Sequence, residues 1–218
     1  MTTLPNFKNT INKIFSPPPQ MVPRIRSYAG ESEELDKYFR IVPNRLTKET
    51  KKELLKLANE KDAFVDISYK VSFFKYPSKL QKFAPWGVAQ MLRVTEEDST
   101  IHKDNSRTNE FDGTYLPRRT VINYPLTDNT PRTNWYDDNK KLVCTTEYNK
   151  KLYPSLPDEC FTLEGKNNNA AILNTGGGYH NVEFKEGDKP RIVFQLCFDS
   201  DIDDVADMFK FMYGGYNI

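Results

Sequence analysis

Two histidines and one aspartate are the residues of this sequence whose types and spacing best suit metal chemistry. The chain has 218 residues and only two histidines. His102 stands in "STIHKDN" (99–105), two residues before Asp104, and His180 follows 78 positions later in "NTGGGYHNVEF". If 100–104 is extended, the side chains of His102 and Asp104 point to the same face. Two imidazoles and a carboxylate can hold one face of an octahedral Fe(II) ion and leave positions open for other ligands.

An arginine further along the chain suits the binding of a small dicarboxylate. In "YHNVEFKEGDKPRIVFQLCFD" (179–199) the turn "EGDK" predicts a hairpin that pairs His180 with Gln195. His180, Arg191 and Gln195 would then share one side of a sheet, with Arg191 roughly 13 Å along the strand from His180 at about 3.3 Å per residue. A guanidinium there can grip the far carboxylate of a dicarboxylate whose other end chelates the metal.

These residues resemble the signature of the Fe(II)/2-oxoglutarate-dependent dioxygenases, in which H-x-D is followed by a second histidine and then by a basic residue. The matching residues are His102, Asp104, His180 and Arg191, and the resemblance spans roughly residues 64–199. It implies that the first three bind Fe(II) and that Arg191 binds the co-substrate 2-oxoglutarate. It also implies hydroxylation of a substrate by O₂, with release of succinate and CO₂, inside a double-stranded β-helix (jelly roll).

Within that superfamily the sequence is most similar to the prolyl-4-hydroxylase-like branch. The similar stretches are "AQMLRVTEEDSTIHKD", "RRTVINYPLTD" and "RIVFQLCFD". The resemblance implies that Tyr124 contacts 2-oxoglutarate, with Asn123 as the alternative, because alternation lets only one of the two face inward. Leu92 stands where the branch has another tyrosine, and "NTPRTNWYD" replaces a Gly-Gly. A peptidyl side chain or a small metabolite is the implied substrate, selected by loops at 76–86 and 127–169.

Other functions remain open at this point. A jelly roll whose metal is structural or absent would be a non-catalytic binding module. A cupin-like iron enzyme that does not use 2-oxoglutarate is a third interpretation. The glycines of "NTGGGYH" do not form a phosphate-binding loop, since no Lys-Ser/Thr pair and no helix follows them. They instead indicate a tight turn or a close backbone approach beside the metal.

The pattern of short runs rich in β-branched and aromatic residues predicts a mainly β fold with flanking helices. The expected strands are 64–74, 87–95, 100–104, 118–126, 133–136, 170–174, 179–184 and 191–198. Helices are expected within 44–62, capped at Thr50, and at about 201–212. Residues 1–30, with "SPPPQMVPR", predict an extended N-terminal arm, and 31–218 a single double-stranded β-helix domain.

The composition indicates which classes of binding partner are not expected. The formal net charge is +1 and no basic excess occurs, so nucleic acid is not an expected partner. The mean hydropathy is −0.70 and no run approaches membrane-spanning length, which predicts no membrane association and a cytoplasmic protein. The three cysteines (Cys144, Cys160 and Cys197) lack metal-ligand spacing and are expected to be ordinary thiols.

Overall fold

A computed structural model gives the fold and describes nine stretches of the chain. These are residues 13–15, 33–42, 44–66, 70–95, 98–127, 132–146, 169–184, 187–188 and 190–213. The proline-rich part of the predicted arm and most of the predicted loop 127–169 lie outside the described residues. Of the arm, Phe15 is wholly buried, pairs with Leu46 and stacks on Trp86.

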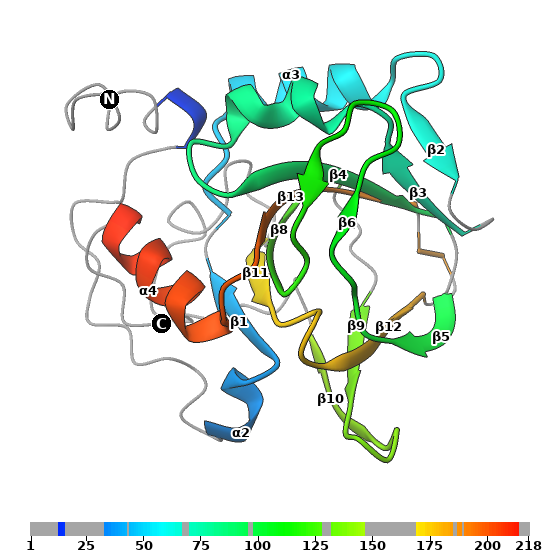
Figure 1. The fold of residues 1–218 in the computed structure, drawn as a ribbon, viewed down its shortest axis with the longest axis vertical. Helices are drawn as coiled ribbons and strands as arrows, with labels where there is room; N and C mark the ends of the chain where they lie inside the picture. The colour runs from blue at the N-terminus through cyan, green and yellow to red at the C-terminus, as the bar shows by residue number, and fades with distance from the viewer. Residues whose placement is uncertain are drawn as a thin grey trace.

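Two antiparallel sheets face each other (Figure 1). The major sheet has seven strands in the order β1 (Phe39–Val42), β11 (Ala170–Leu173), β8 (Thr120–Pro125), β13 (Arg191–Phe198), β4 (Val88–Val94), β3 (Val71–Phe74) and β2 (Phe64–Asp66). The minor sheet has four, in the order β10 (Leu142–Thr146), β9 (Arg132–Tyr136), β12 (Tyr179–Glu183) and β5 (Asp98–His102). A short hairpin of β6 (Arg107–Thr108) and β7 (Tyr115–Leu116) leads from the minor to the major sheet.

The connections between the sheets are those of a jelly roll, as the sequence predicts. From β4 the chain passes to β5 in the minor sheet, returns to β8, crosses to β9 and β10, returns to β11, and crosses again to β12 and back to β13. Apart from β10, which pairs only with β9, each of these strands therefore lies beside at least one strand that is distant in sequence. Such wrapping encloses the space between the sheets, where a buried site can form.

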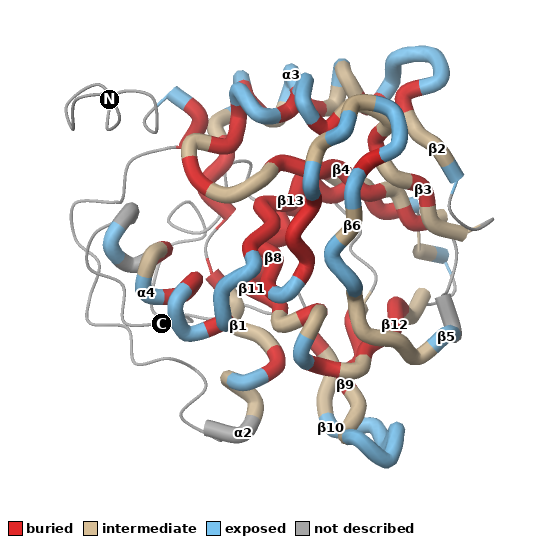
Figure 2. Tube along the Cα trace, viewed as in Figure 1, coloured by how far each residue is buried: buried red, intermediate tan, exposed pale blue. Residues whose placement is uncertain are grey.

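Helices cover the outer face of the major sheet and form the main core there. They are α3 (Lys48–Ala58), the 3₁₀ helix η2 (Pro77–Phe83) and α4 (Ile202–Tyr213), whereas the short helix α2 (Glu33–Asp36) precedes β1. Leu54 of α3, Phe83 of η2 and Phe209 of α4 belong to one cluster with Phe194 and Tyr124 of the sheet. Figure 2 shows the buried residues concentrated along β4, β8 and β13. The inner face of the sheet is left for the site.

Helix α4 confirms the predicted C-terminal helix within one residue at each end. Helix α3 is shorter than the predicted segment, and its cap is Thr47, whose hydroxyl accepts from the Thr50 amide, so the predicted cap at Thr50 is wrong. The segment 64–74 forms two paired strands, β2 and β3, where one was expected.

The predicted hairpin between 179–184 and 191–198 is wrong. Strand β12 pairs with β5 and β9 in the minor sheet, whereas β13 lies between β4 and β8 in the major sheet. Alternation along a strand does not reveal which strand lies next to it. His180 and Arg191 therefore reach the same interior from opposite sheets, and the 13 Å separation along one sheet does not apply.

No helix in the described part of the chain is long and apolar enough to cross a membrane. Cys144 and Cys197 are free thiols, as expected, and Cys160 lies outside the described residues. Burial raises the pKa of Cys197 to about 12 and that of Cys144 to about 11. Both thiols are therefore protonated at neutral pH.

Candidate metal centre

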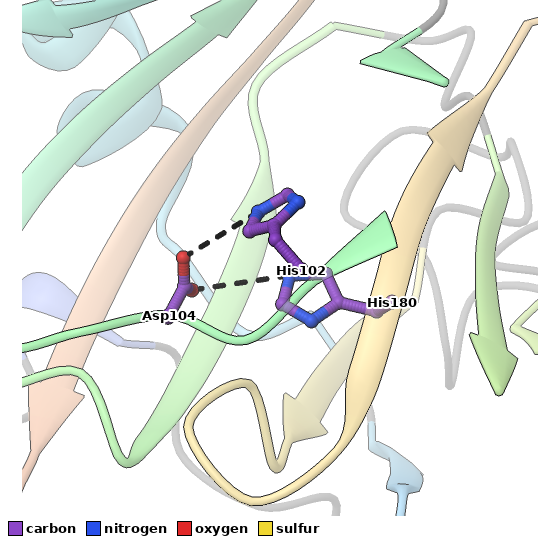
Figure 3. A group of neighbouring side chains, drawn as sticks. All are labelled: His102, Asp104 and His180. Carbon is purple, nitrogen blue, oxygen red and sulfur yellow. Dashed lines mark ion pairs between the residues drawn. The ribbon is translucent and has the colours of Figure 1, made fainter. Parts of the chain in front are cut away.

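The three predicted metal ligands meet between the sheets (Figure 3). His102 is the last residue of β5, and His180 of β12 pairs with it directly, so both side chains project from one face of the minor sheet. Asp104 follows β5 in a loop. The backbone amide of Asp104 donates to the carbonyl oxygen of Thr175 at 2.8 Å, and this hydrogen bond holds the residue in place.

The ligand atoms lie close enough for one metal ion. They are all within 4.8 Å of one another. His102 Nε2 is 3.8 Å from Asp104 Oδ1, and His180 Nε2 is 4.0 Å from Asp104 Oδ2. With bonds of about 2.1 Å at right angles, neighbouring ligand atoms would be roughly 3 Å apart, so the donors need to close by about 1–2 Å. The residues present therefore fit a facial two-histidine, one-carboxylate site.

Backbone carbonyls fix the tautomer of both imidazoles. Nδ1 of His102 is 2.8 Å from the carbonyl oxygen of Thr100, and Nδ1 of His180 is 3.1 Å from that of Gly178. A carbonyl oxygen only accepts hydrogen bonds, so each Nδ1 carries the proton and each Nε2 keeps its lone pair. This is the arrangement that orients histidines for metal binding. Burial also lowers the pKa of His180, outweighing the attraction of Asp104, so the imidazole is neutral at pH 7.

Arg118 holds the third ligand. Its Nη2 donates to Asp104 Oδ2 at 2.6 Å, and both side chains are largely buried. Burial alone would raise the pKa of Asp104, but the Arg118 guanidinium, with His180 and His102, outweighs it and keeps that pKa below its ordinary value. The carboxylate is therefore ionised, and one of its two oxygens is already engaged. Oδ1 is the oxygen that would be left to bind a metal.

Trp135 supports His180 from the neighbouring strand. The two residues pair directly across β9 and β12, and their ring centroids are 5.3 Å apart. The indole is wholly buried, and its Nε1 donates to Thr146 Oγ1 at 2.7 Å. Trp135 therefore lies behind the candidate metal ligand His180.

The glycine turn after β11 makes the close approach that the sequence predicts. The Gly176 amide donates to the carbonyl of Arg119 at 2.9 Å. A Cβ on Gly176 would lie 2.8 Å from Arg119 Cα and 2.9 Å from the carbonyl oxygen of Arg118. Only glycine lets this turn sit against the backbone of Arg118 and Arg119, directly before β8. The same turn supplies the Thr175 carbonyl that anchors Asp104.

The triad opens into a cavity of about 380 Å³ between the sheets. Arg191, the first residue of β13, lines it and is only 2% exposed. Gln195, on the same side of β13, donates to Asn123 Oδ1 at 2.8 Å, and both line the cavity. The remaining wall is largely apolar and includes Leu92. Cavities of this size hold small-molecule ligands.

The predicted inward position of Tyr124 is wrong. Its ring is wholly buried in the core outside the major sheet, 5.4 Å from Phe15 and 6.2 Å from Phe194 between ring centroids. Asn123 takes the cavity side of β8. Alternation limits the inward residue to one of the two, as expected, but its phase along the strand is set by the helices that cover the outer face.

Two arginines at the site were not anticipated. Arg118 binds the metal-ligand carboxylate, and Arg107 of β6 lines the cavity. A signal for Arg118 is present in the sequence, because "RRTVINYP" places a cation directly before a strand that is buried throughout. A buried guanidinium needs an anion, and Asp104 supplies one.

Comparison with known proteins adds weak structural likenesses. No protein-family model and no curated protein sequence matches the chain. Similar solved structures include HygX from Streptomyces hygroscopicus with nickel, 2-oxoglutarate and hygromycin B, at 13% identity and a TM-score of 0.43 over 75% of this chain and 83% of that one. HygX with nickel and 2-oxoglutarate gives 12% identity and a TM-score of 0.41 over the same shares.

HygX with iron bound is similar at 14% identity and a TM-score of 0.39, over 78% of this chain and 86% of that one. The prolyl-4-hydroxylase-like branch finds no support among these likenesses. Likeness at these TM-scores does not establish a shared function, which has to come from the residues of the site.

Proposed function

We propose that this protein is an Fe(II)- and 2-oxoglutarate-dependent dioxygenase that hydroxylates a peptidyl side chain or a small metabolite. One observation carries the proposal: His102, Asp104, His180 and the buried Arg191 line a single cavity between the two sheets. The ligand set is that of non-haem Fe(II) oxygenases. With O₂ and 2-oxoglutarate, bound iron would supply the oxidation of a C–H bond coupled to formation of succinate and CO₂.

The chain's own residues would prepare the site for the metal. His102 and His180 offer Nε2 lone pairs because Nδ1 is protonated on each ring. Asp104 offers Oδ1 while Arg118 engages Oδ2. Three ligands on one face leave the opposite face for the co-substrate and O₂. The apolar walls limit the access of water to that face.

Arg191 would bind the distal carboxylate of 2-oxoglutarate. Its guanidinium stays charged and presents donors in a fork that matches a carboxylate. The valines beside it in the cavity wall suit the methylene groups of a short dicarboxylate, and the polar pair Asn123–Gln195 offers further hydrogen bonds. These features favour 2-oxoglutarate over an iron chemistry that needs no dicarboxylate.

The test is anaerobic titration of the full chain with Fe(II) and then 2-oxoglutarate, recording the weak visible charge-transfer band of the chelate. Wild-type protein should develop the band, and Arg191→Ala should need much more 2-oxoglutarate to do so. Arg93→Gln is the matched control, because Arg93 stacks on the Phe64 ring outside the cavity. A protein that fails to bind iron overturns the proposal, and iron binding without a band points to an enzyme that does not use 2-oxoglutarate.

Turnover separates the enzyme from a non-catalytic binding module. Asp104→Ala and His102→Ala should abolish succinate formation while the far-ultraviolet circular dichroism stays that of the folded chain. Succinate formation at the wild-type rate in either variant would rule out the assigned ligands.

A further inference from the structure

Arg107 is a cation of the cavity for which the proposed function gives no role. It lines the same cavity as the triad, and no carboxylate of the described residues forms an ion pair with it. Its Nε is buried without a hydrogen-bond partner in the described part of the chain. Burial, together with Arg118, lowers the pKa of Arg107 to about 10, so the guanidinium is still charged at neutral pH.

The charges of the cavity do not balance without another anion. Three arginines and one carboxylate line it. Arg118 is compensated by Asp104, and on the proposed function Arg191 is compensated by the distal carboxylate of 2-oxoglutarate. The other carboxylate of 2-oxoglutarate binds a divalent metal that Asp104 neutralises only in part. Arg107 is left over, and a half-buried cation is more favourable when an anion pairs with it.

The Phe73 ring holds this guanidinium in place. The Arg107 Cζ lies 3.5 Å from the Phe73 ring centroid, and the Arg118 Cζ lies 5.2 Å from it. Because Arg118 binds Asp104, the shared ring places Arg107 on the triad side of the cavity. A guanidinium that stacks on an aromatic ring still presents the N–H donors at its edge, and these can bind a ligand.

Arg107 and Arg191 reach the cavity from different elements, since Arg107 belongs to β6 and stacks on Phe73 of β3, whereas Arg191 belongs to β13. Phe73 lies in β3 and pairs with Leu92, whereas Arg191 lies in β13 and pairs with Val94. Strand β4 separates the two. On the proposed function the dicarboxylate is chelated to the metal and bound by Arg191, so Arg107 is the cation left for a second molecule.

We propose that Arg107 binds an oxyanion of the substrate, a carboxylate or a phosphate group, and so selects an acidic substrate for the reaction. The inference rests on the proposed function for the role of the substrate. A fork of donors on a stacked, preorganised guanidinium matches either anion, and the same residue would disfavour neutral analogues.

The test uses the full chain loaded with Zn(II) and excess 2-oxoglutarate, so that no turnover occurs and Arg191 is occupied. Acetate and methyl phosphate are titrated as probes of the two anions, with acetamide and methanol as neutral counterparts, and binding is followed by ligand-observed NMR. At least one anion should bind, and Arg107→Gln should weaken it by about tenfold or more, the effect of losing one charge-assisted hydrogen bond. Arg93→Gln should bind the anion as the wild type does.

Each remaining outcome overturns the inference. These outcomes are equal anion binding by Arg107→Gln, equal binding of a neutral counterpart, absence of any Arg107-dependent anion binding, and loss of 2-oxoglutarate rather than of the probe. Failure of the proposed function is seen separately, as wild-type protein that binds no 2-oxoglutarate in the loading step. The acetate and methyl phosphate arms distinguish a carboxylate substrate from a phosphate substrate.

Discussion

At the scale of single residues, the contact between Arg118 and Asp104 prepares the metal centre. The guanidinium keeps the carboxylate ionised in a buried place and occupies one of its oxygens. A carboxylate without that partner would favour protonation on burial, and a protonated acid is a poor metal ligand. Arg118 is therefore a positioning residue for the metal.

Arg118→Gln is expected to weaken Fe(II) binding by roughly 10- to 100-fold, the usual effect of removing an outer partner of a metal ligand. The loss should be greater at lower pH, because the pKa of Asp104 rises when the guanidinium is gone. Anaerobic Fe(II) titration at several pH values measures both effects. Arg119→Gln is the control, since Arg119 pairs with Asp201 at the surface. Equal affinity and an unchanged pH profile in Arg118→Gln would contradict this role.

The stability of the metal-free protein should fall on acidification. Burial keeps the pKa of His180 below its ordinary value of 6.5, so below pH 6.5 the unfolded chain takes up a proton that the folded chain does not. The free energy of unfolding then decreases as the pH falls, by at most about 1.4 kcal/mol per pH unit for one proton. Urea unfolding between pH 5 and 7.5 measures this slope. His180→Gln should flatten it, and the same slope in both proteins would refute the assignment.

Asp104 acts in the same direction at lower pH. Its pKa in the folded protein is below its ordinary value of 3.8, so its contribution to stability is present above pH 3.8 and is lost as the pH falls through the folded value. Both groups therefore make the metal-free protein more stable at neutral pH than in acid. At neutral pH His180 is neutral and Asp104 is ionised, which are the states that bind a metal.

At the scale of elements, the turn between β11 and β12 connects the metal centre to the major sheet. Gly176 lies against the backbone of Arg118 and Arg119, and Thr175 anchors the Asp104 amide. A side chain on Gly176 would have to displace backbone atoms. The turn would move away, and the carbonyl that anchors Asp104 would move with it.

Gly176→Ala is therefore expected to lower both the free energy of unfolding, by about 1–3 kcal/mol, and the affinity for Fe(II). Gly177→Ala is the comparison, because the three atoms nearest to its Cβ would belong to the Asn174 side chain and not to the backbone of Arg118 and Arg119. Chemical unfolding and anaerobic Fe(II) titration of both variants test this. An affinity for Fe(II) that is unchanged in Gly176→Ala would show that the turn does not position Asp104.

Most elements of the fold are visible in the sequence, but their pairing is not. The expected strand at 191–198 is β13, and its apolar side, with Phe194 and Leu196, packs in the core as predicted. The predicted pairing of β13 with β12 is wrong, because short turn signals suggest local hairpins whereas a jelly roll pairs strands that are distant in sequence. Strands β1 and β10 were missed: β1 has only four residues, and β10 has mostly exposed or half-buried ones.

The metal ligands were found more readily than the residues that support them. His102, Asp104 and His180 form a pattern of types and spacing, and the structure brings them together. The assignment of these ligands to iron stays a prediction, as does the role of Arg191. Arg118 and Arg107 carry no such pattern, because their partners are set by how distant strands fold together. The signal that the sequence offers is for Arg118, which stands just before the apolar strand β8.

At the scale of the whole molecule, the cavity joins two sheets that otherwise meet through small apolar clusters. The metal ligands come from the minor sheet and the loop after it, whereas Arg191, Gln195 and Asn123 come from the major sheet. A co-substrate chelated to the metal and bound by Arg191 would span the two. Ligand binding should therefore stabilise the whole fold rather than one sheet.

Thermal unfolding under anaerobic conditions tests this coupling. Fe(II) should raise the Tm, and 2-oxoglutarate should add a further rise only when the metal is present, because chelation and Arg191 act together. At a hundredfold excess over its Kd, a ligand that binds only the folded state adds about 2.7 kcal/mol to the free energy of unfolding. For a chain of this size, that corresponds to a rise of roughly 5–10 °C in the Tm.

Arg191→Ala should retain the rise caused by Fe(II) and lose most of the rise caused by 2-oxoglutarate. An equal rise with 2-oxoglutarate in this variant would mean that the distal carboxylate is bound elsewhere, and Arg107 would then be the cation to examine. A rise in the Tm with 2-oxoglutarate in the absence of metal would mean that the arginines of the cavity bind the co-substrate without chelation. The dependence of the 2-oxoglutarate-induced rise in the Tm on the metal and on Arg191 therefore reports which groups bind the co-substrate.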